Sequence, residues 1–174
     1  KPTESGLIPL ANLTGGLFYA LRVLGLECPP GFTNVSAYCY HLDPQPDEFE
    51  NKSVSCKAKG GYLAKIDSAD EQSNLELFLK GQNTSGQQQF FIGLKDYIGD
   101  NQLSSYKWTV DNTSMVYSHW FPAEPNRRYQ RCVKIWLGGV PFASWMDDVC
   151  MANPPNTGAV CEADMIPSLK PMIL

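Results

Sequence analysis

The sequence predicts an α+β domain stabilised by disulfide bonds. Two helical patterns come early in the chain and short strand patterns come late, an order typical of α+β rather than alternating α/β folds. The chain has 174 residues, six of them cysteine. A domain of this size buries roughly two-thirds of the surface of its unfolded chain, so it can form a core without a metal.

The composition limits the kinds of partner. The chain is 43% hydrophobic and 11% aromatic, with a net charge of -4. An acidic chain does not favour nucleic acid or an anionic membrane surface. No apolar run is long enough for a transmembrane segment, since Pro9 and Arg22 interrupt the only candidate. The chain also lacks the cleavage pattern of a signal peptide, so we expect a mature sequence.

Cysteines and glycosylation sequons predict a secreted protein. Six cysteines without a C-x-x-C pair indicate three disulfides rather than a zinc site, and disulfides belong to oxidising compartments. Asn-x-Ser/Thr sequons, which accept glycans in secreted chains, occur at Asn12, Asn34, Asn51, Asn83 and Asn112. We therefore expect an extracellular glycoprotein.

Apolar segments flank the cysteine-containing region on both sides. Residues 1–27 form an N-terminal arm in which leucines recur every three or four positions, and Thr14 can cap a short helix over residues 17–26. Residues 163–174 form an apolar tail punctuated by prolines. Either segment can pack on its own domain or dock on another subunit in a homo-oligomer, and the sequence leaves both options open.

The central region, residues 28–162, contains the predicted helices and strands. Helical spacing of apolar residues predicts a helix within residues 46–60, which ends at Gly60-Gly61. A capping-box pattern over residues 68–71 begins a second helix that runs to about Lys80. Strand patterns occupy residues 38–40, 62–66, 90–94, 106–110, 132–136, 144–145 and 159–162.

Taken together, these residues resemble the long form of the C-type lectin-like domain. Each motif is weak alone, but their order and spacing over residues 28–162 are specific. The motifs are Cys28-Pro29-Pro30-Gly31-Phe32, Tyr38-Cys39-Tyr40, Phe49 before Cys56, residues 61–66, Glu71-Gln72, residues 91–94, Trp108, Trp120, Glu124-Pro125-Asn126, Trp145, Cys150 and Cys161-Glu162. The resemblance implies the disulfides Cys28–Cys39, Cys56–Cys161 and Cys132–Cys150.

The resemblance also implies where a ligand binds, in the loop-rich residues 120–148. Sugar-binding members of this family hold one calcium with five side chains, and the Glu-Pro-Asn order is similar to that of mannose-type members. Glu124, Asn126 and Asp147 match the family's ligands, whereas Gln130 replaces a glutamate and Met146 replaces an asparagine. The candidates for contact with a sugar are therefore Glu124, Asn126, Gln130 and Asp147. Calcium does not accept a thioether, so the resemblance implies a weak or vestigial calcium site. The Glu124-Pro125 bond is expected to be cis.

Three arginines accompany this degraded site. Arg127 and Arg131 stand where the family's auxiliary calcium ligands are acidic, and cations repel the metal. We expect Arg127, Arg128 or Arg131 to pair with the Glu124 and Asp147 carboxylates, unless they form only a solvated loop face. Tyr129, next to these residues, is the best candidate for stacking on a sugar ring.

Two functions are compatible with these residues. The first is a secreted carbohydrate-binding protein that needs little or no calcium, with a glycan or glycoprotein as partner and no required cofactor. The second is a metal-independent module that binds protein or assembles, as an oligomer or filament, through its apolar termini. We expect no enzyme, because the predicted disulfides use every cysteine and no G-x-S-x-G motif occurs.

Overall fold

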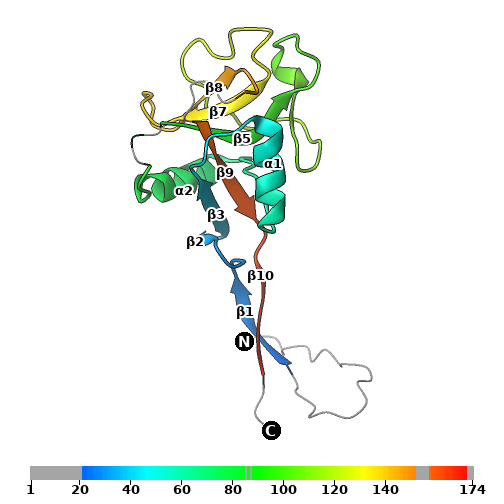
Figure 1. Ribbon diagram of the computed structural model, residues 1–174, viewed down its shortest axis with the longest axis vertical. Coiled ribbons are helices and arrows are strands. Elements are labelled where there is room, and N and C mark those ends of the chain that lie inside the picture. Colours follow the sequence, from blue (N-terminus) through cyan, green and yellow to red (C-terminus); the bar gives the residue numbers. More distant parts are fainter. Residues whose placement is uncertain (1–20, 85, 87, 152–156, 172–174) are drawn as a thin grey trace.

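Loops lie at one end of the molecule and a thin two-stranded ribbon at the other (Figure 1). The computed structural model describes residues 21–84, 86, 88–151 and 157–171. Its helices are α1 (Phe49–Ala58) and α2 (Ala69–Lys80), with a 3-10 helix at Leu103–Ser105. Its strands are β1 (Leu21–Glu27), β2 (Thr33–Val35), β3 (Tyr38–Asp43), β4 (Tyr62–Leu63), β5 (Gln89–Asp96), β6 (Tyr106–Trp108), β7 (Cys132–Trp136), β8 (Ser144–Asp148), β9 (Thr157–Ala163) and β10 (Ile166–Pro171).

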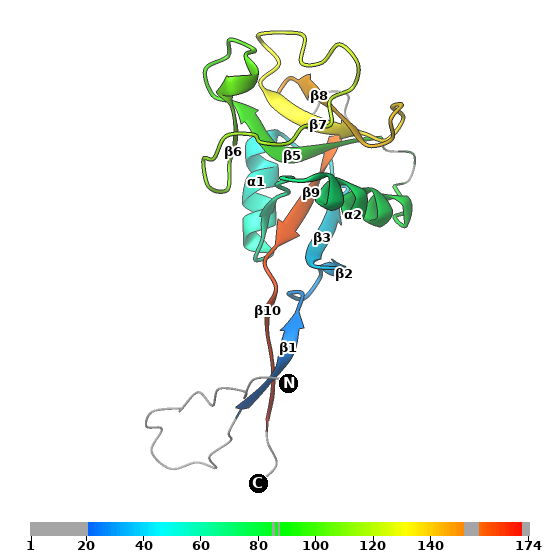
Figure 2. The same ribbon diagram turned by 180° about the vertical axis from the view of Figure 1, so that it is seen from behind.

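One mixed sheet forms the body of the molecule. Its strand order is β2-β3-β9-β5-β7-β8, with β4 paired to β9 and β6 paired to β5. Only the β5–β9 pair is parallel among the described strands. The helices α1 and α2 lie beside the β3–β9 part of the sheet, away from β8 (Figure 2). The α+β class predicted from the sequence is confirmed.

Both helices form where the sequence predicts them. The Ser68 hydroxyl accepts a hydrogen bond from the Glu71 amide at 3.1 Å and so caps α2. The Glu71 carboxylate in turn accepts from the amide of Asp67, one residue before the cap. α1 ends before Gly60, whose positive φ of 87° is a conformation that glycine adopts without strain.

The core divides into two apolar clusters. The larger is built around Trp145, whose ring meets those of Trp108 and Trp120 edge-on, with centroids 5.9 Å and 5.8 Å away. Edge-to-face contacts of this kind add to the burial energy of the rings. The smaller cluster surrounds Phe49 and Phe91 and includes the cysteines Cys39, Cys56, Cys132 and Cys161.

All three predicted disulfides are present. They join Cys28 to Cys39, Cys56 to Cys161 and Cys132 to Cys150. The second spans a sequence separation of 105 residues. In the chain-entropy model, a loop of that length stabilises the fold by roughly 4–5 kcal/mol.

The prediction of a helix over residues 17–26 is wrong in its described part. Residues 21–27 form β1, which pairs antiparallel with β10, so the two apolar flanking segments contact each other. A short helix containing Gly25 is marginal, whereas β10 supplies partners for the backbone of β1. Thr14 and Leu17, the proposed start of that helix, lie outside the described residues.

Four predicted glycosylation sites lie on the surface. The side chains of Asn34, Asn51, Asn83 and Asn112 are exposed, while Asn12 lies outside the described residues. Glycosylation at these positions stays a prediction. Neither described helix has the length and apolar character needed to cross a bilayer.

Candidate functional site

The site is a long loop, residues 119–131, that lies against strand β8. Trp145 of β8 anchors it, since its amide donates to the His119 carbonyl and its carbonyl accepts from the Phe121 amide, both at 2.8 Å. The Trp145 indole N–H also donates to Gln72 of α2 at 3.1 Å. These bonds fix an irregular segment to the centre of the core.

Asp147 holds the tip of this loop. Its carboxylate is 2% exposed, and its two oxygens accept the main-chain N–H groups of Asn126 at 2.9 Å and Arg127 at 3.0 Å. A buried carboxylate that receives two N–H groups is largely satisfied by the protein itself. The loop conformation therefore depends directly on Asp147.

Glu124 lies near Asp147, and the pKa of its carboxyl group is raised. The Glu124–Pro125 bond is cis, as predicted. One Glu124 oxygen accepts from the Asn126 side-chain amide at 2.8 Å, and the other is buried without a hydrogen-bond partner. Burial first, and then the neighbouring Asp147 carboxylate, raise the pKa of Glu124 to about 8.

Asp148 points to the opposite face of β8 from Asp147, as alternation along a strand requires. It pairs with the fully buried Lys134 ammonium at 2.8 Å and accepts a 3.4 Å bond from Gln130. Burial lowers the pKa of Lys134, and Asp148 opposes that shift. The Gln130 carbonyl oxygen is buried without a hydrogen-bond partner. Gln130 therefore binds Asp148 rather than Asp147.

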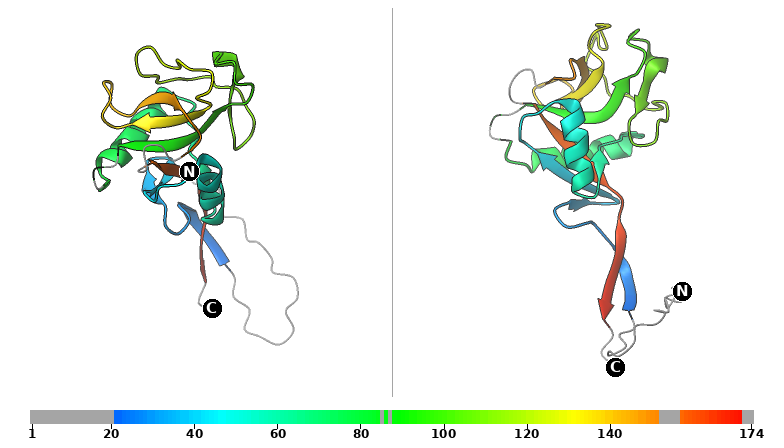
Figure 3. Two further views of the ribbon diagram at one scale, coloured as in Figure 1. Left: turned by 45° about the horizontal axis from the view of Figure 1, so that its top comes forward. Right: turned by 45° about the vertical axis from the view of Figure 1, so that its right-hand side comes forward.

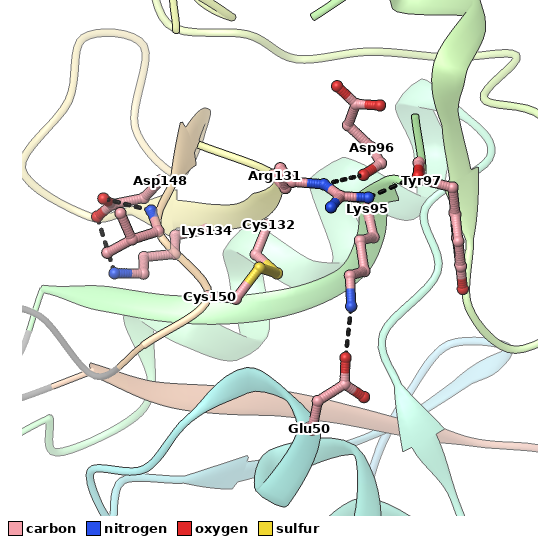
Figure 4. Close-up of a disulfide and its surroundings, with 10 residues drawn as sticks. Glu50, Lys95, Asp96, Tyr97, Arg131, Cys132, Lys134, Asp148 and Cys150 are labelled. Atoms are coloured by element: carbon pink, nitrogen blue, oxygen red, sulfur yellow. Dashed lines mark hydrogen bonds and ion pairs between the residues drawn. A yellow bond between two sulfur atoms is a disulfide. The ribbon is translucent and has the colours of Figure 1, made fainter. Parts of the chain in front are cut away.

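Of the two alternatives for the arginines, pairing with the Glu124 and Asp147 carboxylates is not observed among the described residues. The Arg127 guanidinium contacts the Tyr129 hydroxyl and lies 5.8 Å from its ring centre. Arg131 donates to the main-chain carbonyls of Asp96, at 3.0 Å, and Tyr97 (Figure 4). Main-chain N–H groups reach Asp147 directly, so no guanidinium is needed there. Arg128 is exposed.

A second ordered loop lies beside the site, and the role of Asp96 in ordering it was not predicted from the sequence. Asp96, fully buried at the end of β5, accepts the amides of Ile98, Gly99 and Asn101 at 3.0, 2.7 and 2.9 Å. With Arg131 on its carbonyl, Asp96 fixes residues 97–101 next to the Cys132–Cys150 disulfide (Figure 4). An aspartate at a strand end before a Gly-Asp-Asn turn is the signal that indicates such a loop.

These residues do not fit a calcium site of the sugar-binding type. Calcium requires six to eight oxygen ligands. Both Asp147 oxygens accept N–H groups, Asn126 directs its amide N–H to Glu124, and Met146 supplies no oxygen. Within the described ranges, no cluster of three or more His, Cys, Asp or Glu side chains is arranged to hold a metal. Low-affinity calcium binding stays a prediction.

The predicted sugar-contacting residues are accessible to different degrees. Asn126 and Tyr129 are exposed, Tyr129 to 60%, whereas Glu124 and Gln130 are half-buried. Trp108 and Tyr106 are fully buried in the core, and Trp136 is half-buried. The structure thus brings Glu124, Asn126 and Asp147 together and leaves Tyr129 at the surface.

The comparisons with known proteins agree with this architecture. The sequence profile of the lectin C-type domain matches residues 45–163. The perlucin-like protein of Mytilus galloprovincialis is 26% identical over 156 residues, 86% of this chain and 94% of the mussel protein. C-type lectin domain family 4 member G of Mus musculus is 25% identical over 87% of this chain, which spans 50% of the mouse protein.

A solved structure agrees as well. The C-type lectin domain of murine dendritic cell inhibitory receptor 2, solved in complex with N-glycan, superposes with a TM-score of 0.63 and 26% identity. The match covers 79% of this chain and 99% of that domain. With its profile match, its three disulfides and its loop site on β8, the chain belongs to the C-type lectin family.

Proposed function

We propose that this protein is a secreted recognition protein that binds carbohydrate through residues 120–148, with weak or absent dependence on calcium. Membership of the lectin family supports the class of ligand, as does the N-glycan complex of the 26% identical murine receptor domain. The disulfides and the exposed sequons support an extracellular location. Binding rather than catalysis is the activity we assign.

The observation that carries the proposal is the bonding of Asp147. In a metal-dependent loop the cation gathers the carboxylates, and the loop loses its order when the cation leaves. Here two main-chain N–H groups occupy Asp147 and hold Asn126 and Arg127 in place. These bonds support a loop that keeps its order, and its binding surface, when a chelator removes calcium.

Polar and aromatic groups around Asn126 suit a neutral sugar. The exposed Asn126 amide and the half-buried Glu124 and Gln130 groups supply donors and acceptors for hydroxyls. The Tyr129 ring, exposed to 60% and backed by Arg127, gives a face on which a sugar ring can stack. These contacts need no metal ion.

A glycan array probed with calcium and then with a chelator tests the proposal. We expect the same glycans to be bound in both conditions, because no contact described above passes through calcium. Binding that disappears in the chelator contradicts the metal-independent site. The absence of binding in both conditions rejects carbohydrate as the ligand.

A matched pair of tyrosine variants locates the surface. Tyr129→Ala removes the proposed stacking face, and we expect a loss of about 1–2 kcal/mol in glycan affinity, the range of a good aromatic contact. Tyr97→Ala, on the neighbouring loop and 47% exposed, is the control and should retain affinity. Equal losses in both variants would place the glycan across both loops.

A second candidate is a metal-independent module that assembles or binds protein through its terminal segments. The ribbon of β1 and β10 favours it, because Leu26 and Ile166 in this ribbon are 66% and 40% exposed. Two strands alone are marginally stable in water, so such a ribbon gains from further pairing. The two candidates use opposite ends of the molecule and can both be true.

A further inference from the structure

We propose that the outer edge of β1 pairs antiparallel with β1 of a second copy of this chain, forming a closed dimer through a four-stranded ribbon. This inference deepens the second candidate function and does not depend on carbohydrate binding. It rests on the register of the ribbon and on the position of its prolines. The partner strand is identified by asking whether the outer edge of β1 or that of β10 can accept another strand.

The outer edge of β10 is blocked by proline. In the register, Pro167 lies opposite Leu26 and Pro171 lies opposite Leu21. Antiparallel residue pairs alternate between pairs that exchange both hydrogen bonds and pairs that exchange none. A proline has no amide hydrogen, so both prolines take the second kind of position, and their nitrogens face away from β1. Natural sheets use proline in this way to protect an edge.

The outer edge of β1 has no such block. The register shifts between Val23 and Gly25, so Leu21, Val23 and Leu26 lie opposite Pro171, Leu169 and Pro167. The main-chain groups of these three β1 residues therefore also point outward, and each has an amide hydrogen. No described strand pairs with this edge, since the ribbon consists of β1 and β10 only. The outer edge of β1 can thus pair with another strand, whereas the outer edge of β10 is blocked by its prolines.

One open edge per chain determines the symmetry. A head-to-tail contact of β1 with β10 of the next copy would meet the prolines, so an open filament is disfavoured. Pairing β1 with β1 uses the same edge on both copies, which gives a closed two-fold dimer. The sequence of β1 has Arg22 near its start and Glu27 at its end. An antiparallel pair brings opposite charges towards each other, whereas a parallel pair aligns like charges.

The shape of the molecule leaves room for the second copy. The ribbon extends away from the body, at the end opposite the β7–β8 loops, in every view (Figures 1, 2 and 3). Gly25, Leu26 and Glu27 of β1 and Ile166 and Pro167 of β10 are all exposed, so neither face of this part of the ribbon is covered. Pairing at the ribbon therefore keeps both loop sites accessible. Two such sites on one dimer would bind a multivalent surface with higher avidity.

Sedimentation equilibrium of the full chain, with two matched proline variants, tests the dimer. Val23→Pro removes an outward amide from the open edge, and Leu169→Pro removes the outward amide directly opposite, on the edge already blocked. Both leave the inward bonds of the ribbon intact. We expect the wild type and Leu169→Pro to sediment at twice the chain mass and Val23→Pro at the mass of one chain.

Other outcomes overturn the proposal in recognisable ways. A wild type that is monomeric at about 100 μM, a concentration at which weak dimers form, rejects the dimer; hydrogen exchange of β1 then shows whether residues 1–20 protect its amides instead. A dimer that persists in Val23→Pro uses another surface. A Leu169→Pro variant that is equally monomeric shows that ribbon stability, rather than the edge, was lost.

A second variant guards against misfolding of Val23→Pro. Leu26→Lys changes an exposed, outward position to a charged residue without altering the backbone, and we expect it to be monomeric as well. Near-ultraviolet circular dichroism of the buried Trp108 and Trp145 confirms the folded body in each variant. Glycan binding by the monomeric variants is measured separately, so failure of the dimer and failure of carbohydrate binding remain distinguishable.

Discussion

The loop end and the ribbon end of the molecule differ in how their backbones are held. The loop of residues 119–131 has almost no regular structure, yet it is bonded to Trp145 and Asp147 in the core and lies beside the Cys132–Cys150 disulfide. The ribbon is paired as two antiparallel strands with one register shift, yet its described side chains at Leu26 and Ile166 are exposed. The loop end is thus irregular but bonded to the core, whereas the ribbon end is formed by paired strands but is exposed.

Strand pairing and the burial of the bonded groups are therefore separate contributions to local stability in this fold. Main-chain bonds that water can reach contribute little, whereas a bond to a buried charged group is costly to lose. We therefore expect the loop end to be the more rigid one, as the proposed binding surface requires. We expect the exposed ribbon to be the less stable end.

Asp147→Ala should cause the largest loss of stability. It leaves the amides of Asn126 and Arg127 without their buried acceptor, and we expect a cost of about 3–5 kcal/mol in the free energy of unfolding. Urea denaturation measures it. Asp100→Ala is the control, because Asp100 is less buried and accepts the Gln102 amide within its own loop, so its loss should cost below about 1 kcal/mol. Similar costs for both variants would contradict the anchoring role of Asp147.

Much of the fold could be predicted from the sequence because the core elements carry their own local signals. Ser68 marks the start of α2, Gly60 marks the end of α1, and the alternating or apolar runs mark β5 and β7. The N-terminal arm could not be predicted in this way. Its leucine spacing matches a helix, but the chain forms β1 because a strand about 140 residues later supplies its partner.

The proximity of the candidate site residues could be predicted from the sequence, but their bonds could not. Motif order placed Glu124, Asn126 and Asp147 together, and the structure brings them together; their role in binding stays a prediction. Which donor satisfies a carboxylate depends on the backbone path of a loop, and the sequence does not contain that path. Main-chain N–H groups therefore took the place predicted for an arginine, and the contact of Gln130 with Asp148 had no signal in the sequence.

The free energy of unfolding should depend on pH through Glu162, which lies near the end of β9. Its carboxylate accepts the Lys65 amide at 2.9 Å and lies 3.4 Å from the Tyr62 hydroxyl. Burial, and next the Glu71 carboxylate, raise the pKa of Glu162 from 4.5 to about 8. A raised carboxyl pKa favours folding below the unfolded value, and this contribution is lost as the pH rises through 8.

Glu162→Gln tests this pH dependence. The variant is uncharged at every pH, so between pH 5 and pH 9 we expect it to lose less stability than the wild type, by about 3–4 kcal/mol. Denaturation at several pH values measures the difference. Asp164→Asn, which keeps Glu162 and changes the exposed acceptor of the same tyrosine, should follow the wild-type curve. Parallel curves for the wild type and Glu162→Gln would show that Glu162 is ionised throughout.

The smallest expected effect comes from restoring calcium ligands to the loop end. Met146→Asn with Gln130→Glu restores the two ligand types that the family has at these positions, which adds one oxygen ligand and one negative charge to the loop end, and calcium affinity rises with ligand charge. We expect about a tenfold gain over the wild type, or about 1.4 kcal/mol, because Asp147 still has to give up its amide bonds. Isothermal titration measures this gain.

The pH dependence of the same titration identifies the metal position. Calcium must displace the proton that Glu124 retains with a pKa of about 8, so affinity in the double variant should increase from pH 6 to pH 8. Gln102→Glu adds the same charge on an exposed loop position and should leave calcium affinity unchanged. If the wild type itself binds calcium at micromolar affinity, and Asp147→Ala abolishes that binding, then the loop is ordered by metal after all.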